Sequence, residues 1–274
     1  MKKLLEVEWM KLKNYRAFIV LISLFGIGII LSNYIVFSVN KSIVGQMNTK
    51  GMLNNFRPYD FRNTWETTSY VSGWLLMLPA MLMIILITNE YTFRTSRQNI
   101  IDGWTRRDFI RVKLVLGLIL AIATTLVVIV TALAFGIGSG KPFSWNGISN
   151  VAFFFLKAVS YNVIAVLIAV LVRKTGFAIG LFFIYMGAEN IIAQLLDVWS
   201  IWLKQHHYGD FGSMGDYLPM NAADGLLSFP DSPFKSLAKT ALPTDYTSLV
   251  MALAVVYLVL FTYLAERRFV RKDL

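Results

Sequence analysis

The sequence predicts an all-α integral membrane protein with six transmembrane helices and both termini in the cytoplasm. Hydrophobic residues make up 56% of the 274 positions, which is above the usual share for soluble domains. Six apolar runs are long enough to cross a bilayer, which needs about 20 helical residues. Basic residues gather in alternate loops. We therefore predict one transmembrane domain over residues 1–274, with little chain left for a soluble domain.

The N-terminal segment, residues 1–16, is predicted to form an amphipathic helix in the membrane interface. Apolar residues, including Trp9, alternate there with lysines and glutamates. The apolar run that follows is too long for the core of a signal peptide and is predicted to span. The six predicted spans cover residues 17–39, 71–88, 112–137, 151–172, 176–196 and 247–264. The first two are separated by a predicted outer loop over residues 40–69, and a long outer loop over residues 203–244 precedes the last.

The orientation follows from the basic residues. The N-terminal segment, the second-to-third connection with its flanks, the Arg173-Lys174 turn and the C-terminal tail hold 17 of the 26 Lys and Arg residues, against 8 in the other loops. Positive loops stay in the cytoplasm, so both termini are predicted to be cytoplasmic. The net charge of +10 then faces anionic lipid rather than nucleic acid, because the chain offers no basic, aromatic-rich soluble domain.

Residues 88–109 form a polar, basic island between two apolar runs. Glu90 and Arg94 are four positions apart, which favours a helical turn. Gly103 suits a helix C-cap, and Thr105 with Asp108 has the spacing of a capping box before the next span. These features predict a short helix over residues 91–102 that lies along the membrane surface. A basic loop that only sets topology is the simpler alternative, but it does not require a capped helix.

Two charges fall inside predicted spans. Lys157 and Glu189 lie 17 and 15 residues from Lys174 in the tight turn between spans four and five. A helical hairpin places them within about 3 Å of the same depth, so we predict that they approach each other directly or through water. The alternative is an outward-reaching Lys157 and a protonated Glu189. Gly176, Gly180 and Gly187 share one face of span five, which suits close helix packing and, less readily, substrate contact.

Several kinds of catalytic site are disfavoured. The chain has no cysteine, which excludes thiolate chemistry. Its glycine cluster at residues 136–142 is not a phosphate loop, because Phe135 and Pro142 occupy positions that the motif reserves for Gly and Ser or Thr. His206 and His207 with Asp210 lack the ligand spacing of a helical metal site. We expect neither an enzyme nor a metal or cofactor site in this chain.

The island carries a family resemblance. Its succession of Glu90-Tyr91, Arg94-Thr95, the stretch 103–109 and Lys113 resembles the first cytoplasmic loop of ABC-2 type permeases, the membrane subunits of ABC exporters. In that family the loop holds a coupling helix that docks on a separate ATPase chain. The resemblance implies that ATP and Mg are bound by the partner. It assigns docking to Glu90, Arg94, Thr95, Ser96, Arg97, Asn99, Ile100 and Asp102.

The same resemblance implies a second permease copy or a paralogue as partner, contact with membrane lipid, no nucleic acid, and a multi-pass location in the inner membrane of a bacterial cell. It also suggests that Leu218-Pro219 and Leu226-Leu227 in the outer loop dip into the membrane as short helices. The alternative function is an ion-coupled secondary carrier that uses Glu189, since intramembrane acids are functional candidates. The chain shows no repeated halves to support it.

Overall fold

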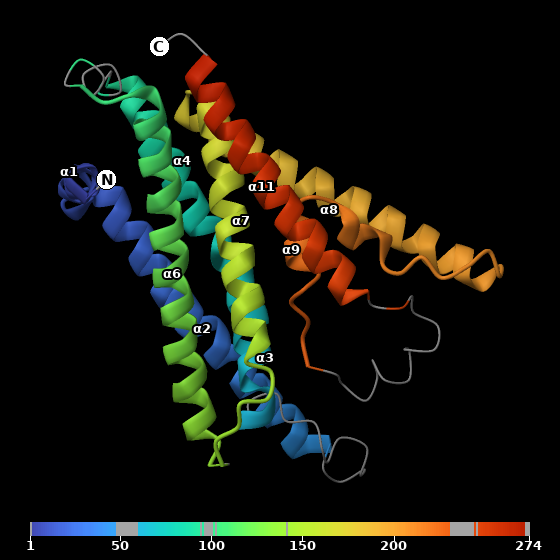
Figure 1. Cartoon of the computed structure of the whole chain (residues 1–274). Coiled ribbons are helices and arrows are strands. Elements are labelled where there is room, and N and C mark those ends of the chain that lie inside the picture. Colours follow the sequence, from blue (N-terminus) through green and yellow to red (C-terminus); the bar gives the residue numbers. More distant parts are fainter. Residues whose placement is uncertain are drawn as a thin grey trace.

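The computed structural model describes residues 2–47, 60–93, 95, 101, 103–140, 142–230, 244 and 246–271. Its regular elements in these ranges are all helical (Figure 1). In chain order they are α1 (Lys2–Lys13), α2 (Arg16–Met47), α3 (Phe61–Gly73), η2 (Trp74–Leu76), α4 (Met77–Thr92), α6 (Arg106–Gly138), α7 (Ser149–Val172), α8 (Thr175–Gln205), η3 (Met214–Tyr217), α9 (Asn221–Asp224) and α11 (Thr247–Arg271).

The six predicted spans are confirmed as helices that are long and apolar enough to cross a membrane, within the described part of the chain. The helices run beyond the predicted limits. α2 continues to Met47 and α3 begins at Phe61, so both ends of the predicted outer loop over residues 40–69 are helical. The apolar run marks only the part of a helix that lies in hydrocarbon, whereas the backbone hydrogen bonds continue into polar sequence.

The second span is made of three consecutive pieces, α3, η2 and α4. The 3-10 turn at Trp74–Leu76 comes directly before Pro79, which lies in the first turn of α4. A proline has no N–H to donate, and its ring clashes with the carbonyl of the residue four positions earlier. That residue is Leu75, so the tighter turn occurs where a regular α-helix would meet the clash.

Helix α7 occupies the centre of the bundle and packs against α3, α4, α6, α8 and α11. Its most apolar window is 67% buried, against 17% for α2 and for α11. Helices α6 and α7 approach closely at Gly117, whose carbonyl accepts a 2.9 Å hydrogen bond from Asn162 Nδ2. The buried core therefore surrounds α7, and the peripheral helices expose long apolar faces, as expected where lipid is the solvent.

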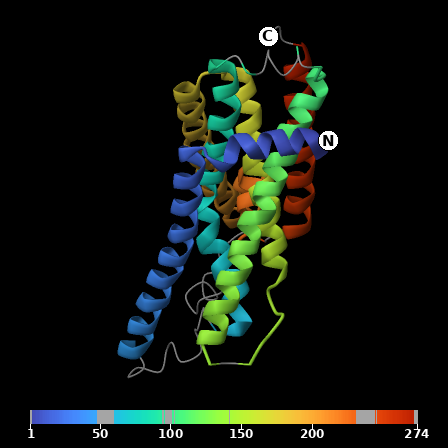
Figure 2. The ribbon, with the colours of Figure 1, turned by 90° about the vertical axis from the view of Figure 1, so that its left-hand side faces the viewer.

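The basic segments gather at one end of the bundle. Figures 1 and 2 show α1 and the C-terminal end of α11 toward the same end, with α1 lying across the other helices. Thr88 of α4 hydrogen-bonds Thr175 at the start of α8 (2.8 Å), which brings the Arg173-Lys174 turn there too. We call this the basic end. The arrangement agrees with the alternation of basic loops in the sequence.

The predicted outer loop over residues 203–244 is partly structured. Helix α8 extends to Gln205, and the chain then turns back to form η3 and α9. Helix α9 lies between the central and C-terminal helices (Figure 1) and packs on α7, α8 and α11. Leu226 and Leu227, which follow it, are buried. Short helices were expected at Leu218-Pro219 and Leu226-Leu227, but these pairs lie beside η3 and α9 rather than within them. The return of the loop brings its polar side chains into the bundle.

Candidate functional site

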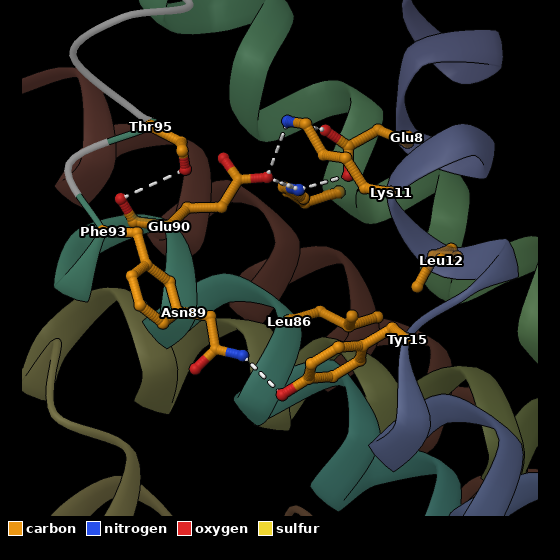
Figure 3. A pocket seen from close by; sticks show the side chains of 10 residues that line it. Glu8, Lys11, Leu12, Tyr15, Leu86, Asn89, Glu90, Phe93 and Thr95 are labelled. Atoms are coloured by element: carbon orange, nitrogen blue, oxygen red, sulfur yellow. Dashed lines mark hydrogen bonds and ion pairs between the residues drawn. The ribbon is translucent and has the colours of Figure 1, made fainter.

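Four charged side chains from three helices meet at the basic end (Figure 3). Lys113 Nζ of α6 lies 2.5 Å from Glu8 Oε2 of α1 and 2.5 Å from Glu90 Oε1 of α4. Lys11 Nζ lies 3.1 Å from Glu8 Oε1 and 3.2 Å from Glu90 Oε1. We call Glu8, Lys11, Glu90 and Lys113 the charge cluster. It links the N-terminal helix α1 to both helices that flank the island.

The charge cluster is largely buried, and it contains two positive and two negative groups. The side chains of Lys113, Glu8 and Glu90 are 1%, 3% and 7% exposed, whereas Lys11 is 36% exposed. Burial alone would raise the pKa of Glu8, but Lys113 and Lys11 outweigh it and lower that pKa. Burial would lower the pKa of Lys11, and the two carboxylates outweigh it and raise that pKa. The opposite charges beside Glu8 and Lys11 therefore favour the ionised form of these two groups.

The charge cluster also positions the start of the connection that leaves α4. Thr95 Oγ1 donates to the Glu90 carbonyl at 3.5 Å, and Asn89 Nδ2 donates to Tyr15 Oη at 2.6 Å. A cavity of about 210 Å³ lies between these groups and the charge cluster, with Phe93 in its wall (Figure 3). The first turn of the island is thereby tied to α1.

The predicted island helix lies only partly in the described residues. Tyr91 and Thr92, placed at its start, belong to the last turn of α4. Thr95 and Ile101 are helical, and Gly103 has the expected positive φ of +99°. Among the predicted docking residues, Glu90 lies in the charge cluster and Thr95 beside it. The others lie outside the described residues: Arg94, Ser96, Arg97, Asn99, Ile100 and Asp102.

The far side of the island is capped as predicted. Thr105 is the N-cap of α6, and its side chain accepts a 3.1 Å hydrogen bond from the Asp108 backbone N–H. The connection is therefore held at both ends, by the charge cluster after α4 and by this cap before α6.

A comparison with family models places the chain. The model of the ABC-2 family transporter proteins matches residues 4–189. The chain belongs to the ABC-2 transporter family. The match begins in α1 and includes all three helices that form the charge cluster, so the cluster lies within the family region of this permease. No curated protein sequence matches the chain.

A second buried polar site lies between α7, α8 and α9. Lys157 Nζ of α7 lies 3.2 Å from Asp224 Oδ1, and Tyr161 Oη donates to Asp224 Oδ2 at 3.0 Å. The ion pair of Lys157 among the described residues is with Asp224 and not with Glu189, so the direct form of the predicted approach is corrected. An approach of Lys157 to Glu189 through water stays a prediction. The sequence placed Asp224 in an outer loop, and only the return of η3 and α9 into the bundle brings it to α7.

Glu189 of α8 is held by the start of the same short helix. Glu189 Oε1 accepts hydrogen bonds from the backbone N–H groups of Met220, at 2.5 Å, and Asn221, at 2.8 Å. The carboxylate thus satisfies donors at the N-terminus of α9 that have no helical partner. Lys157 and Glu189 bind the two ends of α9, and both are buried, at 7% and 6% exposure.

The glycine face of α8 is open within this chain. A Cβ added at Gly176, Gly180 or Gly187 would meet no described atom of other residues within 4 Å. By contrast, a Cβ at Gly136 would lie 2.9 Å from the Phe61 ring. Packing of the α8 glycines against a neighbouring helix stays a prediction, and the described residues of this chain supply no such helix.

The histidine pair has ordinary surface contacts. His206 stacks on Trp202, with ring centroids 4.3 Å apart. Asp210 binds Lys204 at 3.0 Å and Thr244 at 2.7 Å, and the hydrogen bonds of Thr244 lower its pKa despite slight burial. The part of the chain that the structure describes contains no group of three His, Cys, Asp or Glu residues arranged for a metal ion.

Sequence reasoning missed two members of these sites. Glu8 resembles the other charges of an amphipathic helix, and nothing local marks it as the partner of Lys113, 105 positions away. Asp224 is one of several acids in a polar loop. The available signal was the need to neutralise Lys113 and Lys157 inside apolar helices.

Proposed function

We propose that this permease is the translocating subunit of an ATP-driven exporter, and that it docks a separate ABC ATPase through the segment 91–102. The observation that supports this most is the charge cluster. It connects the end of α4, where the segment begins, to α1 and α6. A displacement of the segment by the ATPase would therefore move α1, α4 and α6 together. In this proposal the ATPase binds ATP and Mg, and the permease contributes no catalytic residue.

Burial explains why the charge cluster would transmit force. Separating Lys113 from its two carboxylates leaves uncompensated charge in a water-poor site, which costs about 3–5 kcal/mol. Movements that keep the four groups together are cheaper than movements that separate them. When the ATPase closes on ATP, three parts of the permease would therefore shift as one body: the start of segment 91–102, α1 and the first turns of α6.

The exporter would work as a pair of permeases with two ATPases in the inner membrane of a bacterial cell. The second permease would be another copy or a paralogue. The open glycine face of α8 and its exposed apolar side chains, Ile184 at 68% and Ile191 at 61% among them, offer a surface for that contact.

Charge reversal in the docking segment tests the proposal. Arg94→Glu and Arg97→Glu should each reduce the ATPase activity that co-purifies with the chain, because both arginines lie on the proposed contact. Lys13→Glu is the matched control, since it reverses one exposed charge at the basic end outside the segment. Equal co-purification and transport in both arginine variants and the wild type would refute the docking assignment, provided that all variants insert into membranes.

An ion-coupled carrier remains the alternative function. The burial of Glu189 favours it, but the binding of its carboxylate to the start of α9 gives this acid a structural task. Transport driven by a pH gradient in liposomes that contain only this chain would select the carrier. Transport that requires the ATPase and ATP would select the exporter.

A further inference from the structure

A basic pocket lies where the start of α6 meets the end of α11, and its lining residues include none of the charge cluster. Its volume is about 310 Å³. Three arginines are among the residues that line it: Arg107 of α6, and Arg267 and Arg271 of α11. We call these three residues the arginine triad.

The walls of this pocket are fixed by contacts between the two helices. The rings of Phe109 and Phe269 stack with centroids 4.8 Å apart and an interplanar angle of 5°, and both side chains are buried. Arg106 Nη1 donates to the Val270 carbonyl at 3.3 Å. The pocket is therefore part of the packed bundle, and the triad is presented on a rigid base.

The pocket carries an excess of positive charge. Its one carboxylate, Glu266, lies 3.1 Å from Arg111 of α6. Within the residues that the structure describes, no carboxylate lies within 4.0 Å of the arginine triad. Three arginines that line one small pocket suit a phosphate group, because guanidinium groups donate paired N–H bonds to phosphate oxygens.

An apolar face continues directly from the triad along α11. Val256, Leu260, Tyr263, Arg267 and Arg271 follow one another at spacings of three or four residues, so they form one stripe. Val256, Leu260 and Tyr263 are 59%, 44% and 56% exposed. At 1.5 Å per residue, Val256 lies about 16 Å from Arg267 along the helix, close to the thickness of one hydrocarbon leaflet.

The arginine triad at the end of α11 and the exposed apolar face that continues from it match an amphiphile with an anionic head group. The exposed aliphatic residues would lie beside acyl chains, Tyr263 would lie at the interface, and the triad would meet the head group. A soluble anion would use only the triad. An acidic protein surface would not use the aliphatic part of the stripe, so the apolar continuation favours lipid over a protein partner.

We propose that the pocket between α6 and α11 is a binding site for an anionic phospholipid. The arginine triad binds the phosphate-containing head group, and the exposed face of α11 contacts an acyl chain in the same leaflet. The site is distinct from the proposed ATPase contact, and the proposal does not depend on that contact.

The test measures exchange of a spin-labelled phosphatidylglycerol, compared with spin-labelled phosphatidylcholine, on the full chain in phosphatidylcholine nanodiscs. The wild type should prefer the anionic lipid, and each Gln substitution in the triad should weaken that preference about fivefold. Arg268→Gln is the matched control: it removes an exposed charge from the adjacent position, outside the pocket lining. It should leave most of the preference in place.

Four results would overturn the proposal. The first is an unchanged lipid preference in the folded triple variant Arg107→Gln, Arg267→Gln, Arg271→Gln, and the second is an equal loss of preference in Arg268→Gln. The third is full displacement of the anionic lipid by millimolar inorganic phosphate. The fourth is that the triad variants lose the co-purifying ATPase while their lipid exchange is unchanged. The third result would assign a phosphate site and the fourth a protein contact. If the triple variant does not fold, the single Arg107→Gln and Arg267→Gln variants give the same comparison.

Discussion

Lys113 Nζ lies 2.5 Å from Glu8 Oε2, although the two residues are 105 positions apart and belong to α6 and to the N-terminal helix α1. The same ammonium group also donates a hydrogen bond to Glu90 Oε1. Through this contact the N-terminal helix becomes part of the support for the island, rather than a separate membrane anchor.

Removing Lys113 should destabilise the bundle strongly. Lys113→Met leaves Glu8 and Glu90 buried with only the half-exposed Lys11 as partner, and the expected loss is about 3–5 kcal/mol in the free energy of unfolding. Denaturant unfolding in detergent measures it. Adding Glu8→Gln and Glu90→Gln to the Met variant should recover part of the loss, since no buried carboxylate is then unpaired and the one charge left without its partners, Lys11, is 36% exposed. A loss below about 1 kcal/mol would contradict the burial of the charge cluster.

The charge cluster should also make stability depend on pH. The folded pKa of Glu8 is lowered from its ordinary value of 4.5. Its contribution to stability is therefore present above pH 4.5 and is lost as the pH falls through the lower, folded pKa. The difference in Tm between the wild type and Glu8→Gln should be largest near neutral pH and should shrink in this acid range. A difference that stays constant down to the lowest accessible pH would contradict the assignment.

Lys157 should be energetically coupled to Asp224. Lys157→Met leaves a partly buried carboxylate without its ion-pair partner, and we expect a loss of about 1–3 kcal/mol. In a double-mutant cycle, Asp224→Asn should recover part of that loss, whereas Glu189→Gln should recover less. Lys174→Met, which removes an exposed lysine, is the control. Stronger coupling to Glu189 than to Asp224 would restore the pairing expected from the sequence.

The two kinds of glycine should respond differently to added volume. Gly136→Leu should destabilise the single chain by about 1–3 kcal/mol, because its Cβ would already lie 2.9 Å from the Phe61 ring. Gly180→Leu should leave the stability of the chain unchanged but reduce its association or transport more than Leu181→Ala does. Light scattering together with unfolding separates these effects. Equal, small effects of the two α8 substitutions on assembly and transport would show that the glycine face is incidental.

The spans could be predicted from sequence because hydrocarbon selects unbroken apolar helices of a nearly fixed length. The cap at Thr105 could be predicted because its partner, Asp108, is three residues away. Helix ends in polar sequence, such as residues 40–47 of α2, carry no comparable signal. The partners of Lys113 and Lys157 depend on which distant elements pack together, and several acids in the sequence were equally plausible.

The central claim is that the segment between α4 and α6 contacts an ATPase, and the absence of cysteine permits a direct test. A single thiol can be introduced by Ile101→Cys, where the side chain is 77% exposed, or by Trp145→Cys, which is 65% exposed in the connection between α6 and α7 at the other end of the bundle. After treatment of purified permease–ATPase complex with a short thiol-to-amine crosslinker, the Ile101→Cys variant should yield a permease–ATPase product and the Trp145→Cys variant none. An intact complex that gives no product from Ile101→Cys, or equal product from both variants, would contradict the account.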